Sequence, residues 1–159
     1  DICCTLPAED SLYDWYESRC GLAAASCCSY ETVAAGMETG GIRRLNADEY
    51  GFLREDILKG TAHVGFYYGY LRFQEEIFTS SCGGFFEYKG AIACGYIEND
   101  TLYIKEYLGD EPEFIPALCA ALVAKNAIIR RAAVTGERYI AAYQKTDFPP
   151  DTVWNLTLD

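Results

Sequence analysis

The clearest alternation of apolar and polar residues lies between Gly83 and Lys125. Apolar side chains recur there at every second position, which is the period of half-buried strands. Those positions include Ile92, Cys94 and Tyr96, then Leu102 and Ile104. The run Glu98–Asp100 between them is typical of a turn. Four-residue spacing then takes over at Phe114, Leu118 and Leu122. The pattern predicts a meander of three strands followed by one amphipathic helix.

Similar patterns predict the elements on either side of this stretch. Before it, we expect a strand over residues 2–6, a helix from about residue 8 to a stop at Gly21, and a strand over 22–33. A second helix is expected from a cap at Asn46 or Asp48 to Gly60. The segment His63–Thr79 mixes strand and helix periods, and we favour a helix over residues 70–78. Strands at 127–134, 138–144 and 153–158 complete the list.

Glycines mark the best linker candidate in the chain. Gly36 and Gly40–Gly41 interrupt the periodic segments, so we predict a boundary near residue 38. Residues 1–38 would form a strand–helix–strand end of one domain, and residues 39–159 a second domain. The predicted fold class is α+β, with a mixed, mostly antiparallel sheet and helices packed on its faces.

Charge and hydropathy exclude several classes of partner. Half of the 159 residues are hydrophobic, so the chain is globular, and its net charge of −11 argues against binding nucleic acid or an anionic membrane. No apolar run approaches the roughly 20 residues that span a bilayer. The chain begins at Asp1 without a basic and apolar leader, so we expect a cytoplasmic protein without a signal peptide. A strand directly after Asp1 favours a piece of a longer polypeptide.

The eight cysteines are expected to be reduced and structural. Cys94 and Cys119 fall within apolar patterns and are predicted to be small buried side chains. The sequence has no Cys-x-x-Cys motif, and the only histidine, His63, is not near a second ligand-type cluster. A disulfide or a metal site is the lesser alternative.

Two stretches together resemble the GNAT superfamily of acyl-CoA-dependent N-acyltransferases. The run Leu6–Tyr16, LPAEDSLYDWY, followed by Gly21, is similar to the last strand, helix and strand of such a domain. Residues 42–159 are similar in element order to the second, GNAT-like domain of tandem members, such as the enhanced-intracellular-survival type acetyltransferases. The resemblance implies that the chain is the C-terminal region of a tandem acetyltransferase.

The resemblance also implies two candidate catalytic groups. In the family an amine attacks the thioester, and a Tyr on the late helix acts as general acid toward the thiolate. That residue would be Tyr16, although Gly21 follows it by five positions where the family has four, so Tyr13 is the alternative. In tandem members the terminal carboxylate can enter the active site, which makes Asp159 the second candidate. Glu106, at the end of a strand, is a further candidate base.

The sequence at the expected cofactor site is unfavourable for binding a pyrophosphate group. The family holds the CoA pyrophosphate on the N-terminus of the central helix, in a Gln/Arg-x-x-Gly-x-Gly/Ala loop. Residues 108–113 read LGDEPE at that place. Carboxylates there repel phosphate, and Pro112 lacks an N–H group. We therefore expect no cofactor in this chain, and acetyl-CoA only in the intact parent protein.

These expectations combine into one function and one alternative. The chain would shape the pocket for a small-molecule or peptide amine, and a possible homo-oligomer, in an acetyl-CoA-dependent N-acetyltransferase. Alone it would be inactive. The alternative is a non-catalytic GNAT-like interaction module. An intact pyrophosphate loop ahead of Asp1 would distinguish the two.

Overall fold

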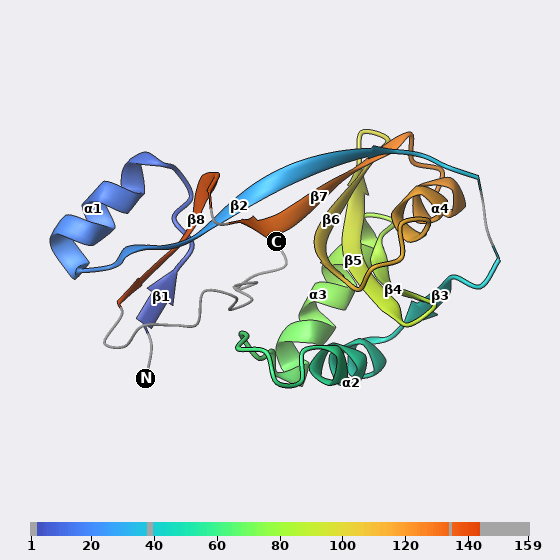
Figure 1. Ribbon diagram of the computed structural model, residues 1–159, viewed down its shortest axis with the longest axis horizontal. Coiled ribbons are helices and arrows are strands. Elements are labelled where there is room, and N and C mark those ends of the chain that lie inside the picture. Colours follow the sequence, from blue (N-terminus) through green and yellow to red (C-terminus); the bar gives the residue numbers. More distant parts are fainter. Residues whose placement is uncertain (1–2, 38–39, 134, 144–159) are drawn as a thin grey trace. The chain divides into compact units, whose positions relative to one another are not determined.

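The computed structural model describes residues 3–37, 40–133 and 135–143, and the side chains of 6–37, 40–133 and 135–142. By their internal contacts these residues form two compact units. The first unit comprises the described residues among 1–29, 61–64 and 131–156, and the second those among 30–60 and 65–130. Figure 1 labels the elements of both. No helix in the described ranges is long and apolar enough to cross a bilayer.

The first unit is a small antiparallel sheet with one helix. Its elements are β1 (Cys3–Thr5), α1 (Ser11–Cys20), the first part of β2 (Ala23–Ala34) and β8 (Glu137–Tyr143). Strand β8 pairs with β1 on one side and with β2 on the other. Helix α1 ends where Gly21 adopts a left-handed φ of 68° and its N–H bonds back to Glu17. Tyr13, Leu22 and Ala141 form the buried cluster at this helix.

The second unit carries the meander and most of the core. Its elements are β3 (Arg43–Leu45), α2 (Ala47–Ile57), α3 (Tyr68–Ser80), β4 (Gly84–Tyr88), β5 (Ala91–Glu98), β6 (Thr101–Leu108), α4 (Phe114–Ala121) and, up to Arg130, β7 (Asn126–Ala133). Strands β3 to β6 are antiparallel neighbours, and β6 pairs in parallel with β7. The crossover between these parallel strands is helix α4, as parallel pairing requires.

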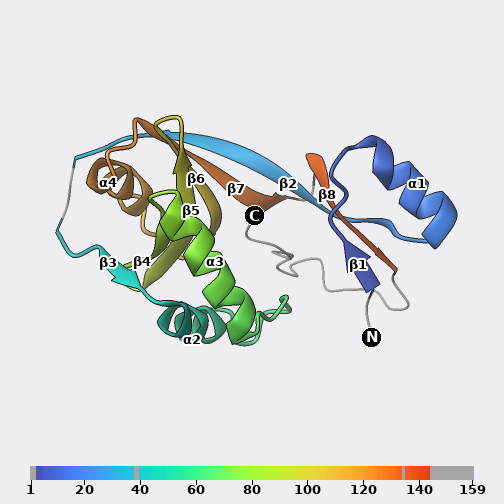
Figure 2. The same cartoon turned by 180° about the vertical axis from the view of Figure 1, so that it is seen from behind.

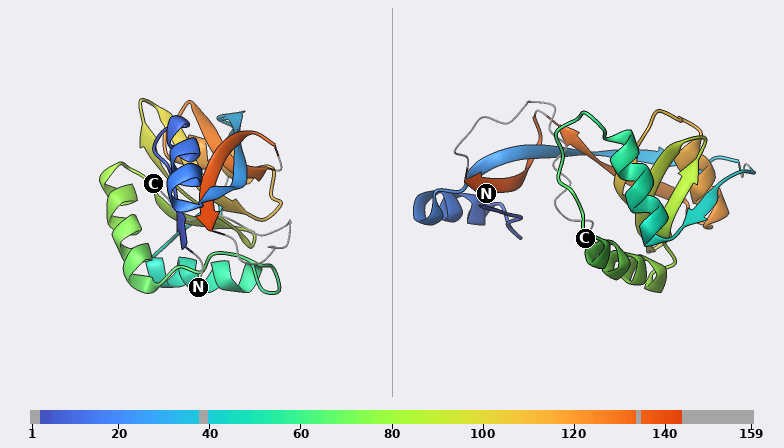
Figure 3. Two further views of the ribbon diagram at one scale, coloured as in Figure 1. Left: turned by 90° about the vertical axis from the view of Figure 1, so that its left-hand side faces the viewer. Right: turned by 90° about the horizontal axis from the view of Figure 1, so that it is seen from below.

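Alternation along the strands divides this core into two layers. Phe86 and Ala93 point into the cluster beneath α4. Their neighbours Phe85 and Ile92 point the other way, into the cluster beneath α2 and α3. Successive strand residues face opposite sides of a sheet, so each face needs its own helical cover. Figure 3 shows these helices and the strands between them from two further directions.

Most predicted elements match the structure. The three meander strands, the helix after them, α1, β1, β2, β7 and β8 lie where the patterns place them, and the fold class is the predicted one. The cap of α2 is Asn46, whose side chain accepts the Glu49 N–H in a capping box. The mixed segment is helical from Tyr68 onward, and β3 was not predicted. The strand expected at 153–158 lies outside the described residues, and the boundary near residue 38 stays a prediction.

Candidate functional site

The β6–α4 corner is the place where the sequence predicted a failed phosphate cradle. Strand β6 ends at Leu108 and α4 begins at Phe114. Between them Gly109 has φ +122°, and a Cβ atom there would lie 2.5 Å from Cβ of Ala91. Only glycine fits both this backbone conformation and the close approach of β5. The corner is therefore tightly packed against the neighbouring strand.

Few backbone donors are left at the start of α4. Pro112 and Pro116 have no N–H group. The Glu111 N–H donates to the Tyr107 hydroxyl at 2.8 Å, which in turn donates to the Glu111 carbonyl at 3.0 Å. The N–H groups of Phe114 and Ala117 donate to the carbonyls of Glu111 and Glu113. Five of the seven positions from Glu111 to Ala117 thus have no N–H to offer an anion.

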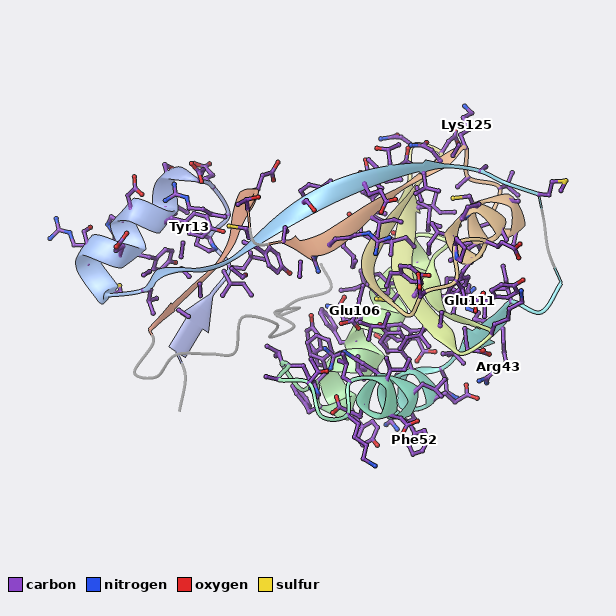
Figure 4. All side chains as sticks on the ribbon, in the orientation of Figure 1. Tyr13, Arg43, Phe52, Glu106, Glu111 and Lys125 are labelled. Carbon is purple, nitrogen blue, oxygen red and sulfur yellow. The ribbon has the colours of Figure 1, made fainter. Side chains whose placement is uncertain are left out.

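Three carboxylates add a charge barrier at the same corner. Asp110, Glu111 and Glu113 precede the helix, and Glu113 sits at the cap position without a side-chain cap bond. Lys89 lies 3.6 Å from the Glu113 carboxylate. Figure 4 labels Glu111 at this corner. The acids predicted at a helix start are there, but they do not cap it.

The antiparallel pair β5 and β6 contains a bulge next to this corner. Cys94 of β5 lies opposite Glu106, while Gly95 lies opposite Ile104, so Lys105 is the extra residue of β6. The ladder between β6 and β7 covers Thr101–Ile104 and Asn126–Ile129. Immediately after it, the Arg130 guanidinium donates to the Lys105 carbonyl at 3.1 Å. A buried arginine therefore bonds to the bulge itself.

Glu106, the predicted candidate base, is locked in a buried network. Its side chain is fully buried and accepts from Nε of Arg54 at 2.9 and 3.2 Å. The Tyr50 hydroxyl donates to Glu106 at 2.6 Å and also contacts Sγ of Cys94 at 3.5 Å. The ring of Phe66 covers the guanidinium of Arg54 at 4.3 Å. A carboxylate held this way is a structural counter-ion rather than a base.

Burial sets the protonation of this network. It raises the pKa of Tyr50 well above its usual value, with the Cys94 and Glu106 groups adding to the effect. Burial alone would lower the pKa of Arg54, but Glu106, Tyr50 and Glu55 together outweigh it, with Glu106 contributing most, and the pKa is raised. It also raises the pKa of the Cys94 thiol to about 12. At neutral pH the network therefore holds a charged guanidinium, a neutral phenol and a neutral thiol.

Sequence reasoning missed Arg54 and Tyr50. The buried face of α2 consists of Ala47, Tyr50, Gly51 and Arg54. These positions follow the i, i+3, i+4, i+7 spacing of a core-facing helix stripe. An arginine on such a stripe needs a buried partner. This spacing was the signal in the sequence that could have identified Arg54 as a buried residue. The structure shows that its buried partner is Glu106.

The structure distinguishes the two tyrosines of α1. Tyr13 is buried and its hydroxyl donates to the Arg138 carbonyl at 2.6 Å. Burial raises the pKa of Tyr13 to about 12. Tyr16 is half-buried and packs edge-on against Trp15 with ring centroids 5.1 Å apart. Figure 4 labels Tyr13 on α1. Asp159, the other predicted catalytic group, lies outside the described residues.

The cysteines described with side chains are free thiols: Cys20, Cys27, Cys28, Cys82, Cys94 and Cys119. Cys94 and Cys119 are fully buried, as their apolar patterns predicted. Among the described residues, no three His, Cys, Asp or Glu side chains gather closely enough to hold a metal ion.

Comparison with solved structures identifies the fold. A GCN5-related N-acetyltransferase from Kribbella flavida matches with a TM-score of 0.58 over 89% of this chain at 11% identity. The chain has the fold of the GCN5-related N-acetyltransferases. A protein from Enterococcus faecalis V583, described as a probable N-acyltransferase, matches with a TM-score of 0.56 at 10% identity and 89% coverage. This GNAT-like chain covers only 42% and 44% of those two proteins, so it spans less than half their length. No family model and no curated protein matches the sequence.

Proposed function

We propose that this chain is one part of an acetyl-CoA-dependent N-acetyltransferase, in which it shapes the acceptor pocket and the oligomer without holding CoA. The observation that carries the proposal is the start of α4 in a GNAT fold. In this fold the helix between the two parallel strands is the expected pyrophosphate site. Here prolines, the Tyr107 hydroxyl and local carbonyls remove most of its donors.

The buried network supports the same division of roles. Glu106, the candidate base of the sequence analysis, lies on β6 beside the bulge. Arg54 and Tyr50 hold its carboxylate away from solvent. A general base has to reach the proton that it removes. The binding of CoA and the general base are therefore assigned to a part of the longer protein outside this chain.

The catalytic acid of the longer protein would come from α1. Tyr16 is the better candidate, because the hydroxyl of Tyr13 already donates to Arg138. The acceptor would be a small-molecule or peptide amine, and the location cytoplasmic, which fits the free thiols. Asp159 remains the second candidate. Removing the last residues from the longer enzyme would leave its activity unchanged if Asp159 has no role.

The test compares this chain with the longest natural polypeptide that contains it. Both are assayed for CoA release from acetyl-CoA with a panel of amines and lysine peptides. We expect turnover only by the longer protein, and loss of turnover when its upstream Gln/Arg-x-x-Gly-x-Gly/Ala segment is altered. Tyr16→Phe in the longer protein should lower kcat, whereas Tyr13→Phe should mainly lower stability. Turnover by this chain alone would overturn the proposal.

A second candidate function follows from the same occupied helix start. The chain would then belong to a non-catalytic module that kept the GNAT shape for binding a partner. Five blocked or missing donors at α4 fit this reading equally well. The absence of any pyrophosphate segment in the longer polypeptide, together with no turnover, would favour it.

A further inference from the structure

The outer face of helices α2 and α3 is unusually rich in exposed aromatic side chains. Five of the nine large hydrophobic side chains exposed in the described residues lie on α2, on α3 or directly before α3. They are Phe52, Ile57, Tyr67, Tyr68 and Phe73. Phe52 is 71% exposed and Figure 4 shows it pointing away from α2. A gathering of exposed aromatic groups is typical of an interaction site.

Contacts between the two helices make this one continuous surface. A Cβ atom on Gly51 would lie 3.9 Å from the ring of Tyr68, so this ring lies at the seam between α2 and α3. One turn away, the Arg72 guanidinium pairs with Asp48 at 3.0 Å. Figure 2 shows α2 and α3 of the second unit from the side on which α3 is in front. We call this surface the aromatic face and define it by Phe52, Tyr67, Tyr68 and Phe73.

Carboxylates accompany the aromatic groups at helical spacing. Asp56 follows Phe52 by four residues and Glu76 follows Phe73 by three, so each pair lies on one side of its helix. Both carboxylates are exposed. Arg72 is the one basic residue of α3, and its guanidinium already pairs with Asp48. The aromatic face is therefore rimmed by negative charge.

A hollow of about 590 Å³ continues the same surface along α3. Its lining residues are Arg72, Glu75, Glu76, Thr79 and Ser80. Glu75 already accepts from the Ala47 N–H and Thr79 from the Arg44 guanidinium. The exposed Glu76 carboxylate can accept hydrogen bonds from an ammonium or guanidinium group of a partner. Aromatic rings next to it favour the same cations and also bury apolar surface. The chemistry matches a partner that carries both basic and apolar side chains.

We propose that the aromatic face and the hollow beside it bind a basic amphipathic peptide segment of a partner protein. Lysine or arginine side chains of the segment lie against Glu76 and in the hollow, and its apolar side chains pack on Phe73 and Tyr68. The rim of carboxylates disfavours an anionic lipid surface, and the net charge of −11 disfavours a second copy of the chain. This binding does not depend on the acyl transfer proposed above.

Fluorescence anisotropy tests the proposal with synthetic peptides. The probe is a labelled amphipathic peptide with one lysine-rich and one leucine-rich face, and its control replaces every lysine by glutamate. We expect saturable binding of the lysine peptide, weaker at high salt, and none of the glutamate peptide. Phe73→Ala should weaken binding about thirtyfold, as for a central aromatic anchor. Glu76→Gln should weaken it about threefold, as for one exposed ion pair.

Matched controls separate this surface from general acidity. Glu17 on α1 is also an exposed acid and belongs to the other unit, and Glu17→Gln should leave peptide binding unchanged. Absence of binding, or equal weakening by Glu17→Gln, overturns the proposal. So does self-association that Phe73→Ala abolishes, or binding to phosphatidylserine vesicles. The assay contains no acyl donor, so a negative result leaves the proposed acyl transfer untouched.

Discussion

The two faces of the sheet in the second unit are covered in different ways. Beneath α4 the core is apolar, and the start of that helix has lost its donors to prolines and to Tyr107. Beneath α2 the core holds a charged pair between Arg54 and Glu106, and the start of that helix has a complete capping box at Asn46. The start of α4 thus keeps few free N–H groups, whereas the opposite face of the sheet keeps buried charge. A fold can thus keep its backbone shape while its polar groups serve a different purpose on each face.

The largest expected effect concerns the charged pair. Glu106→Gln leaves the buried Arg54 with only the half-exposed Glu55 as a counter-ion, and should lower the free energy of unfolding by about 3–5 kcal/mol. Urea unfolding followed by circular dichroism measures this change. The double variant Arg54→Met/Glu106→Leu should recover most of the loss, because an apolar pair has no charge to bury. A loss below about 1 kcal/mol in the single variant would mean that the pair is not desolvated.

The two helix starts provide the next test. Asn46→Ala removes a side-chain acceptor for the Glu49 N–H and should cost about 1 kcal/mol. Glu113→Ala at the corresponding position of α4 should change stability by less than about 0.5 kcal/mol, because its side chain caps nothing. Denaturation midpoints of the two variants, measured side by side, check the difference. Equal losses would show that Glu113 is a cap in solution.

Helix α1 of the first unit gives a third case, in which one hydroxyl ties the helix to a strand. Tyr13→Phe removes the bond to the Arg138 carbonyl and should cost about 1 kcal/mol. Burial raises the pKa of Tyr13 in the folded protein to about 12. The folded state thus favours the protonated phenol, whose stabilisation is complete below the usual tyrosine pKa of about 10. It is lost as the pH rises through about 12.

Ultraviolet titration of phenolate absorbance checks this prediction. The wild type should show one more late-titrating tyrosine than Tyr13→Phe, in addition to the buried Tyr50. Identical titration curves for the two proteins would contradict the assignment.

The smallest expected effect separates charge from missing donors at α4. The triple variant Asp110→Asn/Glu111→Gln/Glu113→Gln removes the repulsion but leaves the prolines and the Tyr107 bond in place. We expect it still to show no binding of pyrophosphate in a calorimetric titration. Binding by the triple variant would mean that charge alone closes the corner, and that the occupied N–H groups matter little.

The sequence predicted the parts of this fold that depend on local pattern. Alternation placed β4 to β6, and the fourfold spacing placed α4. Pro112 was recognised as a missing donor, while the unfavourable place for phosphate at LGDEPE stays a prediction. These features depend on neighbouring residues only, which is why they can be read without a structure.

Features that depend on distant residues were missed. The partner of Glu106 is Arg54, 52 positions earlier in the chain. Tyr107 bonds only four positions ahead, but its direction depends on the turn that Gly109 permits. Three-residue β3 is too short for a period to show, and it forms because β4 offers it an edge. Long-range pairing, rather than local preference, decides each of these.

The central claim is that this chain has the GNAT fold with a closed cofactor site. Isothermal titration calorimetry of the chain with acetyl-CoA tests it most directly, with the intact longer protein as the positive control. We predict no heat of binding to the chain at millimolar acetyl-CoA, and binding to the longer protein. Micromolar binding of acetyl-CoA to the chain itself would contradict the account.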